Sequence, residues 1–345
     1  MKRLCLVSAA ALIAVVFSGL FGTAPAAAET AAEFYQGKVV KLVVGYGPGG
    51  GYDLYARLLA PHLEQRLGAT VVVENRPGGG GMVVISQLAN GDGDGLTLVL
   101  ANLEAAALGQ ILDSAGIRFD VTALPVLARV GSDPKIVLLG TGSPFRSIAD
   151  LQAADRPIRW SGGGKTDAIA DNAAVLSHAL GLRAEIIIGY KGAKESALAA
   201  ARGEADGMAV SDGTARTLIA GGQLAPVAVL SRQRSTLLPE VPTIFEVATI
   251  GDEQAWWLDY RAGLTELGRT LIAAPGTPDD RLAFLRQAID SVLNDPVVVA
   301  EAEATKRPIR YASHQVVEGW IAETIGAVDA AAVEGLREVI LHKYY

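Results

Sequence analysis

The chain has 345 residues, a single cysteine and a formal net charge of −7. An acidic protein is a poor partner for the phosphates of nucleic acid, so we expect no nucleic-acid binding. The length exceeds what one hydrophobic core usually organises, which predicts two domains. Because a lone cysteine cannot form an internal disulfide, the fold must be stabilised by its core.

The first 28 residues have the pattern of a secretory signal peptide. A basic start at Lys2-Arg3 precedes an apolar run over Leu4–Phe21, and the small residues Ala26–Ala28 end it. The run is also about long enough for a membrane anchor, but its small-residue ending favours cleavage near Ala28. We therefore predict a periplasmic protein. Cleavage would remove Cys5, two of the 30 basic residues and none of the 37 acidic ones, so the net charge would fall from −7 to −9.

Strands and helices alternate through the first half of the mature chain. Val39–Val44 is an apolar run bounded by glycines, as a buried strand should be. Leucines then recur at helical spacing from Leu54 to Leu67, and Gly68 follows where a helix should end. The further elements that the pattern predicts are strands at 70–74 and 96–101, a helix near 82–89, and strands at 126–130 and 135–139.

The second half repeats this alternation until a tryptophan-bearing stretch interrupts it. Predicted strands cover 158–160, 185–188, 207–210, 226–230 and 271–273, and predicted helices cover 147–151, 166–180, 194–202, 214–220, 278–293 and most of 314–339. Residues 252–270 are predicted to be irregular, with Trp256 and Trp257 packed in the core or at a lobe interface. The alternation favours an α/β fold whose sheets are mostly parallel.

Two glycine-rich turns stand at predicted helix starts, one in each half. The first lies near Gly47–Gly51 and the second near Gly162–Gly164. Backbone N–H groups at a helix N-terminus can hold an anion, and ligand sites favour domain interfaces and the carboxyl ends of strands. Two lobes that aim these turns at a shared cleft would trap a small anionic molecule.

The first turn also fits a nucleotide site. Gly45-Tyr-Gly-Pro-Gly-Gly50 matches G-x-G-x-x-G, and Glu74 follows at the end of the next strand, where an acidic residue would bind a ribose. An exported nucleotide-dependent oxidoreductase is therefore an alternative. Pro48 counts against it, because the ring has no N–H to donate where a pyrophosphate would approach. Nicotinamide cofactors are also scarce outside the cytoplasm.

Several short motifs, most of them glycine-bearing, occur together and in order along the mature chain. They are Val39–Asp53, with its Gly-Tyr-Gly-Pro-Gly-Gly-Gly-Tyr-Asp turn, Val71–Gly81, Ser161–Gly164, Tyr190–Ala193, Leu237–Glu246 and Ala274–Pro278. In this arrangement the sequence resembles the solute-binding proteins of tripartite tricarboxylate transporters, the TctC or Bug family. The likeness extends over nearly all of the mature chain.

The resemblance implies a two-lobed periplasmic binding protein of type II, a Venus flytrap. It implies that a small carboxylate, either a di- or tricarboxylate or a related organic acid, is captured between the lobes and delivered to a membrane permease. We expect lobe one to hold residues 36–131 and 243–345 and lobe two to hold the insert 132–242. A monomer is expected, and a sensor-coupled binding protein remains a further alternative.

Signs of catalysis or metal binding are weak. The four histidines lack metal-ligand spacing, there is no G-x-S-x-G elbow, and the mature chain would have no cysteine for thiol chemistry. We therefore expect neither an enzyme nor a bound cofactor or metal.

The ligand carboxylate is expected between the two turns. Carried over from the family, this role falls on Gly49–Gly51 and on Ser161–Gly164, while Asn102 and Asp212 occupy positions that line the cleft. The expected ligand-binding residues are Tyr46, Pro48, Gly49, Gly50, Gly51, Asp53, Asn102, Ser161, Gly162, Gly163, Gly164, Lys165, Thr166, Tyr190, Lys191 and Asp212.

Three of these residues have a second interpretation. Asp53 either faces the cleft or stabilises the first turn of its helix through the helix dipole. Lys165 either binds a carboxylate or is a solvated side chain beside Asp167. Asp212 either accepts a hydrogen bond from the ligand or caps the helix that follows.

Two departures from the family leave the identity of the carboxylate open. The family commonly has a hydroxyl residue and then a histidine in the second turn and its helix, whereas this chain has Lys165-Thr-Asp167 and no histidine until His178. Residues 252–270 also differ from the family. Near the first turn, Arg76 is expected to pair with Glu74 rather than with a ligand.

Overall fold

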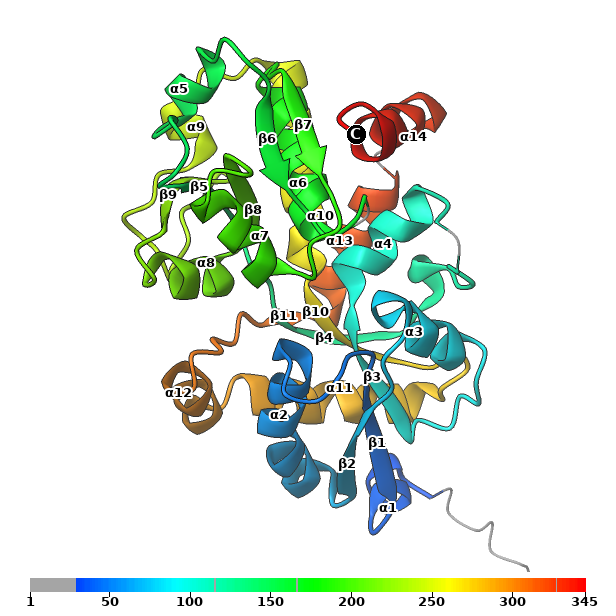
Figure 1. Ribbon diagram of the computed structural model, residues 1–345. Coiled ribbons are helices and arrows are strands. Elements are labelled where there is room, and N and C mark those ends of the chain that lie inside the picture. The colour runs from blue at the N-terminus through cyan, green and yellow to red at the C-terminus, as the bar shows by residue number, and fades with distance from the viewer. Residues whose placement is uncertain (1–28, 115, 166, 327) are drawn as a thin grey trace, which may run out of the picture.

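The computed structural model describes residues 29–114, 116–165, 167–326 and 328–345, and the expected signal peptide lies outside these ranges. The chain forms two α/β lobes, one above the other in Figure 1. Each lobe is built on its own sheet. Within the described ranges, no helix combines the length and the hydrophobicity needed to cross a membrane.

The sheet of lobe one has the strand order β11-β4-β10-β3-β1-β2. Strand β1 pairs in parallel with β2 and β3, whereas β10 pairs antiparallel with β3 and β4, and β11 antiparallel with β4. The sheet is thus mixed rather than mostly parallel, because the chain returns from lobe two before it adds β10 and β11. The strands are β1 (Val39–Val44), β2 (Thr70–Asn75), β3 (Thr97–Asn102), β4 (Val126–Gly131), β10 (Arg269–Ala273) and β11 (Ala312–Ser313).

Helices cover both faces of this sheet. Helix α2 (Gly51–Leu67) buries its leucines and ends at Gly68, whose φ of +66° is the left-handed conformation that glycine adopts most readily. The other helices of this lobe are α1 (Ala31–Tyr35), α3 (Met82–Ala89), α4 (Leu103–Ile111), α11 (Asp279–Leu293), α12 (Pro296–Ala304) and α13 (His314–Gly326). Helix α4 starts directly after β3, so its N-terminus stands at the edge of the sheet that faces lobe two (Figure 1).

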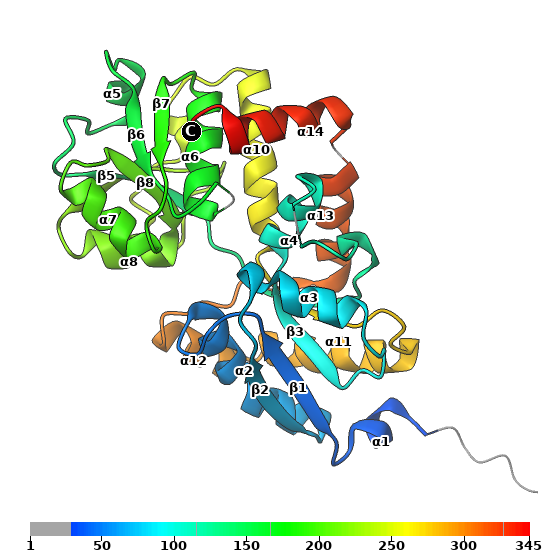
Figure 2. The same ribbon diagram turned by 45° about the vertical axis from the view of Figure 1, so that its right-hand side comes forward.

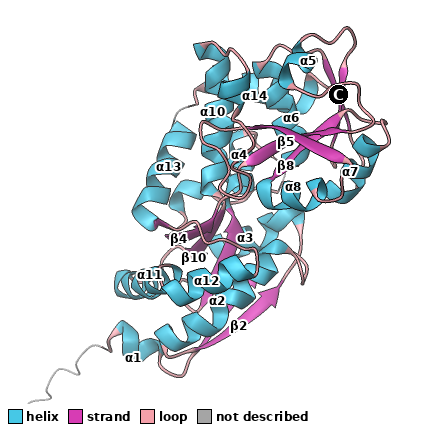
Figure 3. Cartoon of the chain, turned by 90° about the vertical axis from the view of Figure 1, so that its left-hand side faces the viewer, coloured by secondary structure: helices cyan, strands magenta, loops and turns pink. Residues whose placement is uncertain are grey.

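The sheet of lobe two has the order β7-β6-β8-β5-β9 and is also mixed. Strand β6 is parallel to β7 and β8, while β5 is antiparallel to β8 and β9. Figure 3 shows this sheet between its helices, above the sheet of lobe one. The elements are β5 (Lys135–Gly140), α5 (Ile148–Gln152), β6 (Ile158–Ser161), α6 (Ala168–Ala179), β7 (Ala184–Ile187), α7 (Ala193–Ala201), β8 (Gly207–Ser211), α8 (Asp212–Ile219), β9 (Leu224–Val229) and α9 (Ile244–Val247).

The stretch expected to be irregular is instead a long helix, α10 (Asp252–Leu267). It spans the junction between the lobes and packs on α6, α4 and α13 (Figure 2). Its tryptophans lie against other aromatic rings, since Trp256 stacks on Tyr260 with centroids 5.1 Å apart and meets Trp257 edge-on at 5.2 Å. The expected packing role of the two tryptophans is therefore confirmed, although the expected lack of regular structure was wrong.

The C-terminal segment packs on lobe two, contrary to the predicted assignment of residues 243–345 to lobe one. Helix α14 (Ala330–Arg337) leads into a π-helical turn, η3 (Glu338–His342), which lies against α6 (Figure 2). The backbone N–H of Ile186 in β7 donates to the carbonyl of Tyr344 at 2.8 Å. Ile340 is fully buried there. The chain therefore returns to lobe two at its end.

The largest apolar cluster runs through both lobes. It includes Leu103 and Ala106 of α4, Leu264 of α10 and Ala174 of α6, all fully buried. Helices α4, α10 and α6 thus form a packed wall at the back of the junction between the lobes.

Candidate functional site

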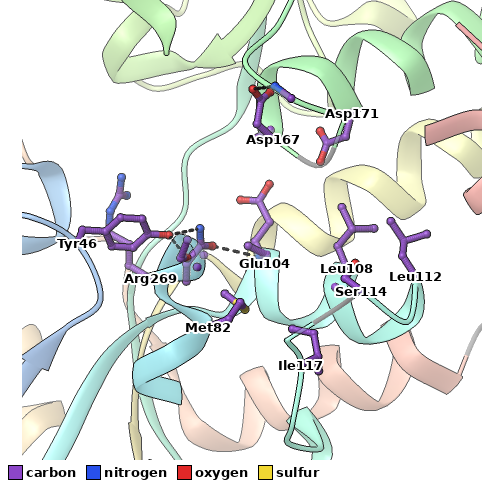
Figure 4. Close-up of a pocket in the computed structure, with 18 of the residues that line it drawn as sticks. Tyr46, Met82, Glu104, Leu108, Leu112, Ser114, Ile117, Asp167, Asp171 and Arg269 are labelled. Atoms are coloured by element: carbon purple, nitrogen blue, oxygen red, sulfur yellow. Dashed lines mark hydrogen bonds between the residues drawn. The ribbon is translucent and has the colours of Figure 1, made fainter. Parts of the chain in front are cut away.

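A cavity of about 570 Å³ lies between the lobes. Lobe one contributes the turn after β1, the start of α3, the length of α4 and the start of β10. Lobe two contributes the segment before β5, the second glycine turn and the first turn of α6. Figure 4 shows the side chains of both lobes converging on this space.

The lobe-one end of the cavity holds an ordered polar group. The rings of Tyr46 and Tyr52 stack with centroids 4.6 Å apart. Asn102 at the end of β3 donates from Nδ2 to the Tyr46 hydroxyl at 3.0 Å, while its Oδ1 accepts from the N–H of Ala105 at 3.2 Å. The Asn102 amide therefore both caps α4 and orients the Tyr46 hydroxyl. The predicted site residues Tyr46 and Asn102 both line the cavity.

Arg269 provides the positive charge at the lobe-one end of the cavity, and it was not among the residues predicted from the sequence. It opens β10 directly opposite Asn102, so the strand pairing sets the two side by side. The guanidinium lies about equally far from the Tyr52 and Tyr55 rings, at 5.1 and 5.0 Å. Its Nη2 donates to Asp133 at 2.5 Å, whereas its buried Nε has no hydrogen-bond partner among the described residues.

The pKa of Arg269 shows how firmly its charge is held. Burial alone would lower this pKa, but the charge and hydrogen bond of Asp133 outweigh burial and raise it above its ordinary value. The side chain is therefore a permanent cation in a site that is largely withdrawn from water. An anion of the ligand can use its remaining donors.

A network of ion pairs crosses the cavity wall beside α4. Glu104 accepts from Lys135 Nζ at 3.1 Å and from Arg261 Nη2 at 2.6 Å, and Arg261 also reaches Asp171 at 3.1 Å. Burial would raise the pKa of Glu104, but the two cations lower it to about 2. Burial raises the pKa of Asp171, and Arg261 offsets this only in part. The network ties α4 of lobe one to β5 and α6 of lobe two through α10.

Apart from Tyr46, the first glycine turn does not line the cavity. The N–H of Gly49 donates to the Asp53 carboxylate at 2.8 Å, and Arg57 pairs with the same carboxylate at 3.0 Å. Asp53 is buried and, chiefly through the Arg57 hydrogen bond, its pKa is lowered. The helix-stabilising interpretation of Asp53 therefore fits. The predicted residues Pro48, Gly49, Gly50, Gly51 and Asp53 are absent from the cavity wall.

The second glycine turn reaches the cavity, but its amides are already occupied. The carboxylate of Asp167 accepts from the N–H groups of Gly163 and Gly164 and from those of Ile169 and Ala170 at 2.9 and 2.8 Å. Of this turn, Gly164 and Asp167 line the cavity. A protein carboxylate thus stands where a ligand carboxylate was expected.

Ser161 and Gly162 lie behind the turn rather than in the cavity. The buried hydroxyl of Ser161 donates to the carbonyl of Ser196 at 3.2 Å, and the N–H of Gly162 donates to Ile187 at 2.9 Å. Both residues therefore shape the turn instead of contacting a solute.

Four further predicted residues lie away from the cavity wall. Lys165 donates to the carbonyl of Leu341 at 2.8 Å, Lys191 is exposed, and Tyr190 is half-buried beside the turn. The Oδ2 of Asp212 accepts from Ser235 at 2.7 Å and from Arg310 at 2.8 Å, while its Oδ1 accepts from the N–H of Gly213 in the first turn of α8 at 2.8 Å, which agrees with the capping interpretation in part. Thr166 lies outside the described residues.

The charged residues that sequence reasoning missed gave only faint signals. Asp167 and Asp171 are four residues apart at the start of a helix, which places them on one face. Glu104 follows Asn102 by two residues, and Arg269 opens an otherwise apolar strand. None of these patterns identifies the ion-pair partners of these side chains, which lie 31 to 157 residues away in the sequence.

The surroundings of Glu74, the residue expected to bind a ribose, do not support a nucleotide site. Glu74 accepts from Arg76 Nε at 3.1 Å, as expected for that pair, and also lies 3.8 Å from Lys41. Neither Glu74 nor the turn around Pro48 lines the cavity.

A two-lobed α/β fold with a polar cavity at the junction defines the class of bilobal solute-binding proteins. Residues 55–331 match the family described as the tripartite tricarboxylate transporter family receptor, TctC, and the chain belongs to this family of solute-binding receptors. The resemblance noted in the sequence is thereby confirmed, and the oxidoreductase alternative is set aside.

Individual relatives agree with this membership. The chain is similar to the protein BugT of Bordetella pertussis, at 28% identity over 320 residues that cover 91% of this chain and 94% of BugT. A ligand-free TctC solute binding protein from Polaromonas superposes with a TM-score of 0.68 at 22% identity, covering 88% of this chain and 98% of that one. A structure from R. palustris with adipate gives 0.68 at 20% identity, covering 88% and 97%. These structures share the fold.

Proposed function

We propose that this protein is a periplasmic receptor that binds a small organic acid between its lobes and delivers it to a membrane permease of the tripartite type. The solute enters the open cleft, and its carboxylate binds at the Arg269 end of the cavity. Closure of the lobes then removes water and strengthens the polar contacts. No catalytic step is part of this role.

The observation that carries the proposal is the state of Arg269. The Arg269 side chain is 16% exposed and lines the cavity, and its bond to Asp133 uses only Nη2, so guanidinium donors remain for an anion of the ligand. A carboxylate suits this group, because guanidinium donors match its two oxygens in geometry and charge. Asn102 and Tyr46 stand beside it as further polar contacts.

Two further points support a small solute. A cavity of about 570 Å³ lies within the range that small-molecule sites occupy, roughly 300–1,000 Å³. The neighbour from R. palustris holds adipate, a small dicarboxylate, in the same fold.

The test removes the cation together with its internal partner. In Arg269→Met/Asp133→Asn neither charge is left unpaired, so we expect the melting temperature to change little. Carboxylate affinity, measured by titration calorimetry over a panel of mono-, di- and tricarboxylates, should fall roughly 10- to 100-fold, since hydrogen bonds to charged groups contribute about 1.5–3 kcal/mol.

The matched control is Arg232→Met/Asp259→Asn. This ion pair, at 2.7 Å, lies outside the cavity and should not affect binding. If the wild-type protein binds no member of the panel, or if the Arg269 variant keeps its affinity, the proposed function is wrong.

A further inference from the structure

We infer that the solute carries one carboxylate and an apolar far end, rather than a second carboxylate. The carboxylate is held on lobe one at Arg269, and the apolar end lies along α4 beneath the first turn of α6. This inference rests on the proposed function, since it names the class of organic acid that the same cavity accepts.

Among the described residues of the second glycine turn, the amide nest is filled by Asp167 and is not free for a second carboxylate. Each oxygen of Asp167 accepts from two backbone N–H groups, Oδ2 from Gly163 and Gly164 and Oδ1 from Ile169 and Ala170. A carboxylate has about four acceptor positions, so the side chain and the helix start satisfy each other. The anion-binding capacity of this helix N-terminus is therefore consumed internally.

The charges around the cavity also oppose a second carboxylate. The described lining residues include the bases Arg269, Lys135 and Arg261 and the acids Glu104, Asp133, Asp167 and Asp171, a formal balance of −1. Lys135 and Arg261 are committed to Glu104 and Asp171. Like charges in a partly desolvated site repel strongly, so each carboxylate beyond the one at Arg269 would be disfavoured.

Most other side chains of the wall are apolar. Leu108 of α4, Leu112 just after it, Met82 at the start of α3, Ala105 and Ile117 face the cavity, and Ser114 is the one hydroxyl among the described lining residues of this part. Figure 4 shows Leu108, Leu112 and Ile117 together, on the side away from Tyr46 and Arg269, with Asp167 and Asp171 above. A solute that extends from Arg269 along α4 meets hydrocarbon, which an alkyl or aryl group fills more favourably than a charged one.

The decisive experiment compares acids that differ only at the far end. Titration calorimetry is run on the wild-type protein with straight-chain monocarboxylates of four to eight carbons, the matching dicarboxylates and the matching ω-amino acids. The tightest monocarboxylate should bind at least tenfold more tightly than the tightest member of either other series. A tighter dicarboxylate or ω-amino acid would overturn the inference and leave the proposed function standing, whereas no binding in any series would count against the proposed function itself.

A pair of variants tests whether Asp167 is the reason for the preference. Asp167→Ser keeps a hydroxyl to cap α6 but frees amides of the turn. The ratio of monocarboxylate to dicarboxylate affinity should therefore fall at least tenfold. Asp329→Ser is the matched control, because Asp329 caps α14 by accepting from Ala332 at 2.8 Å and lies outside the cavity. An unchanged preference in a folded Asp167→Ser protein would contradict the role of the filled turn.

A second pair tests the apolar wall without touching any charge. Met82→Gln places an amide on the wall between Arg269 and the far end (Figure 4), where the hydrocarbon chain of the solute would pass, and should weaken the binding of the best monocarboxylate several-fold. Val83→Gln changes the next residue of α3, which is exposed and faces away from the cavity, and should have no effect. Equal affinities in the two variants would show that the hydrocarbon chain of the solute does not pass Met82.

Discussion

The carboxylate of Glu104 has a pKa of about 2, and this makes it a source of acid sensitivity. In an unfolded chain the pKa of a glutamate is about 4.3. The native state therefore binds this proton less readily than the unfolded state. Ionised Glu104 therefore adds about 2–3 kcal/mol to the free energy of unfolding. This contribution is fully present above about pH 4.3 and is lost as the pH falls toward 2.

We predict that Glu104→Gln lowers the free energy of unfolding at pH 7 by roughly 3 kcal/mol, because Lys135 is left buried without its carboxylate. The variant should also lose less stability than the wild type between pH 5 and pH 2.5. Urea unfolding followed by tryptophan fluorescence measures both effects. Glu240→Gln, at an exposed position, is the control. If the free energy of unfolding fell equally with pH in Glu104→Gln and in the wild type, Glu104 would not be a source of the acid sensitivity.

The segment from α14 to the C-terminus belongs structurally to lobe two, although it follows the last helix of lobe one. Val339, Ile340 and Tyr344 are buried, and the Tyr344 carbonyl extends the hydrogen bonding of β7. This segment is therefore part of the core rather than a loose tail.

We predict that Ile340→Ala destabilises the protein by about 2–5 kcal/mol, the usual cost of truncating a fully buried isoleucine. Val297→Ala in α12 is the control, because that side chain is 69% exposed and should change stability by no more than about 0.5 kcal/mol. Thermal denaturation compares the two. A neutral Ile340→Ala variant would mean that the C-terminal segment is dispensable.

The elements that the sequence predicted well are those with strong local signals. An apolar run bounded by glycines marks β1, and the leucine spacing with Gly68 marks α2 within a few residues. Helix α10 was missed because its buried positions include Tyr260, Arg261 and Thr265 among many polar residues, so no clear apolar stripe is visible. Its burial depends on neighbours that only the folded chain supplies.

The two lobes share one apolar interior, which bears on how the molecule unfolds. The largest cluster joins α4, α10 and α6, and the Glu104 network adds polar links across the same junction. Neither lobe can lose its fold without exposing part of the other's core.

We predict that the protein unfolds in a single cooperative transition. In differential scanning calorimetry, the calorimetric enthalpy should match the van't Hoff enthalpy, as it does for one folding unit. Two resolved transitions would show instead that the lobes unfold independently and that the shared cluster contributes little.

The lining of the cavity was predictable only in part. Tyr46 and Gly164 belong to the two glycine turns that the sequence marks, Asn102 was carried over from the family resemblance, and all three line the cavity. The charges that decide the chemistry were not predictable, because Arg269 acquires its role from Asp133 and from pairing opposite Asn102. Such partnerships depend on how distant segments meet.

The packed helices behind the cavity restrict where a solute can pass. Helix α10 contacts α4 and α6 alike, so these helices close the rear of the junction, while Gly79, Gly80 and Gly164 line the cavity. Under the proposed function, we expect the solute to enter and leave on the side away from the three helices. We also expect the permease to contact both lobes on that side.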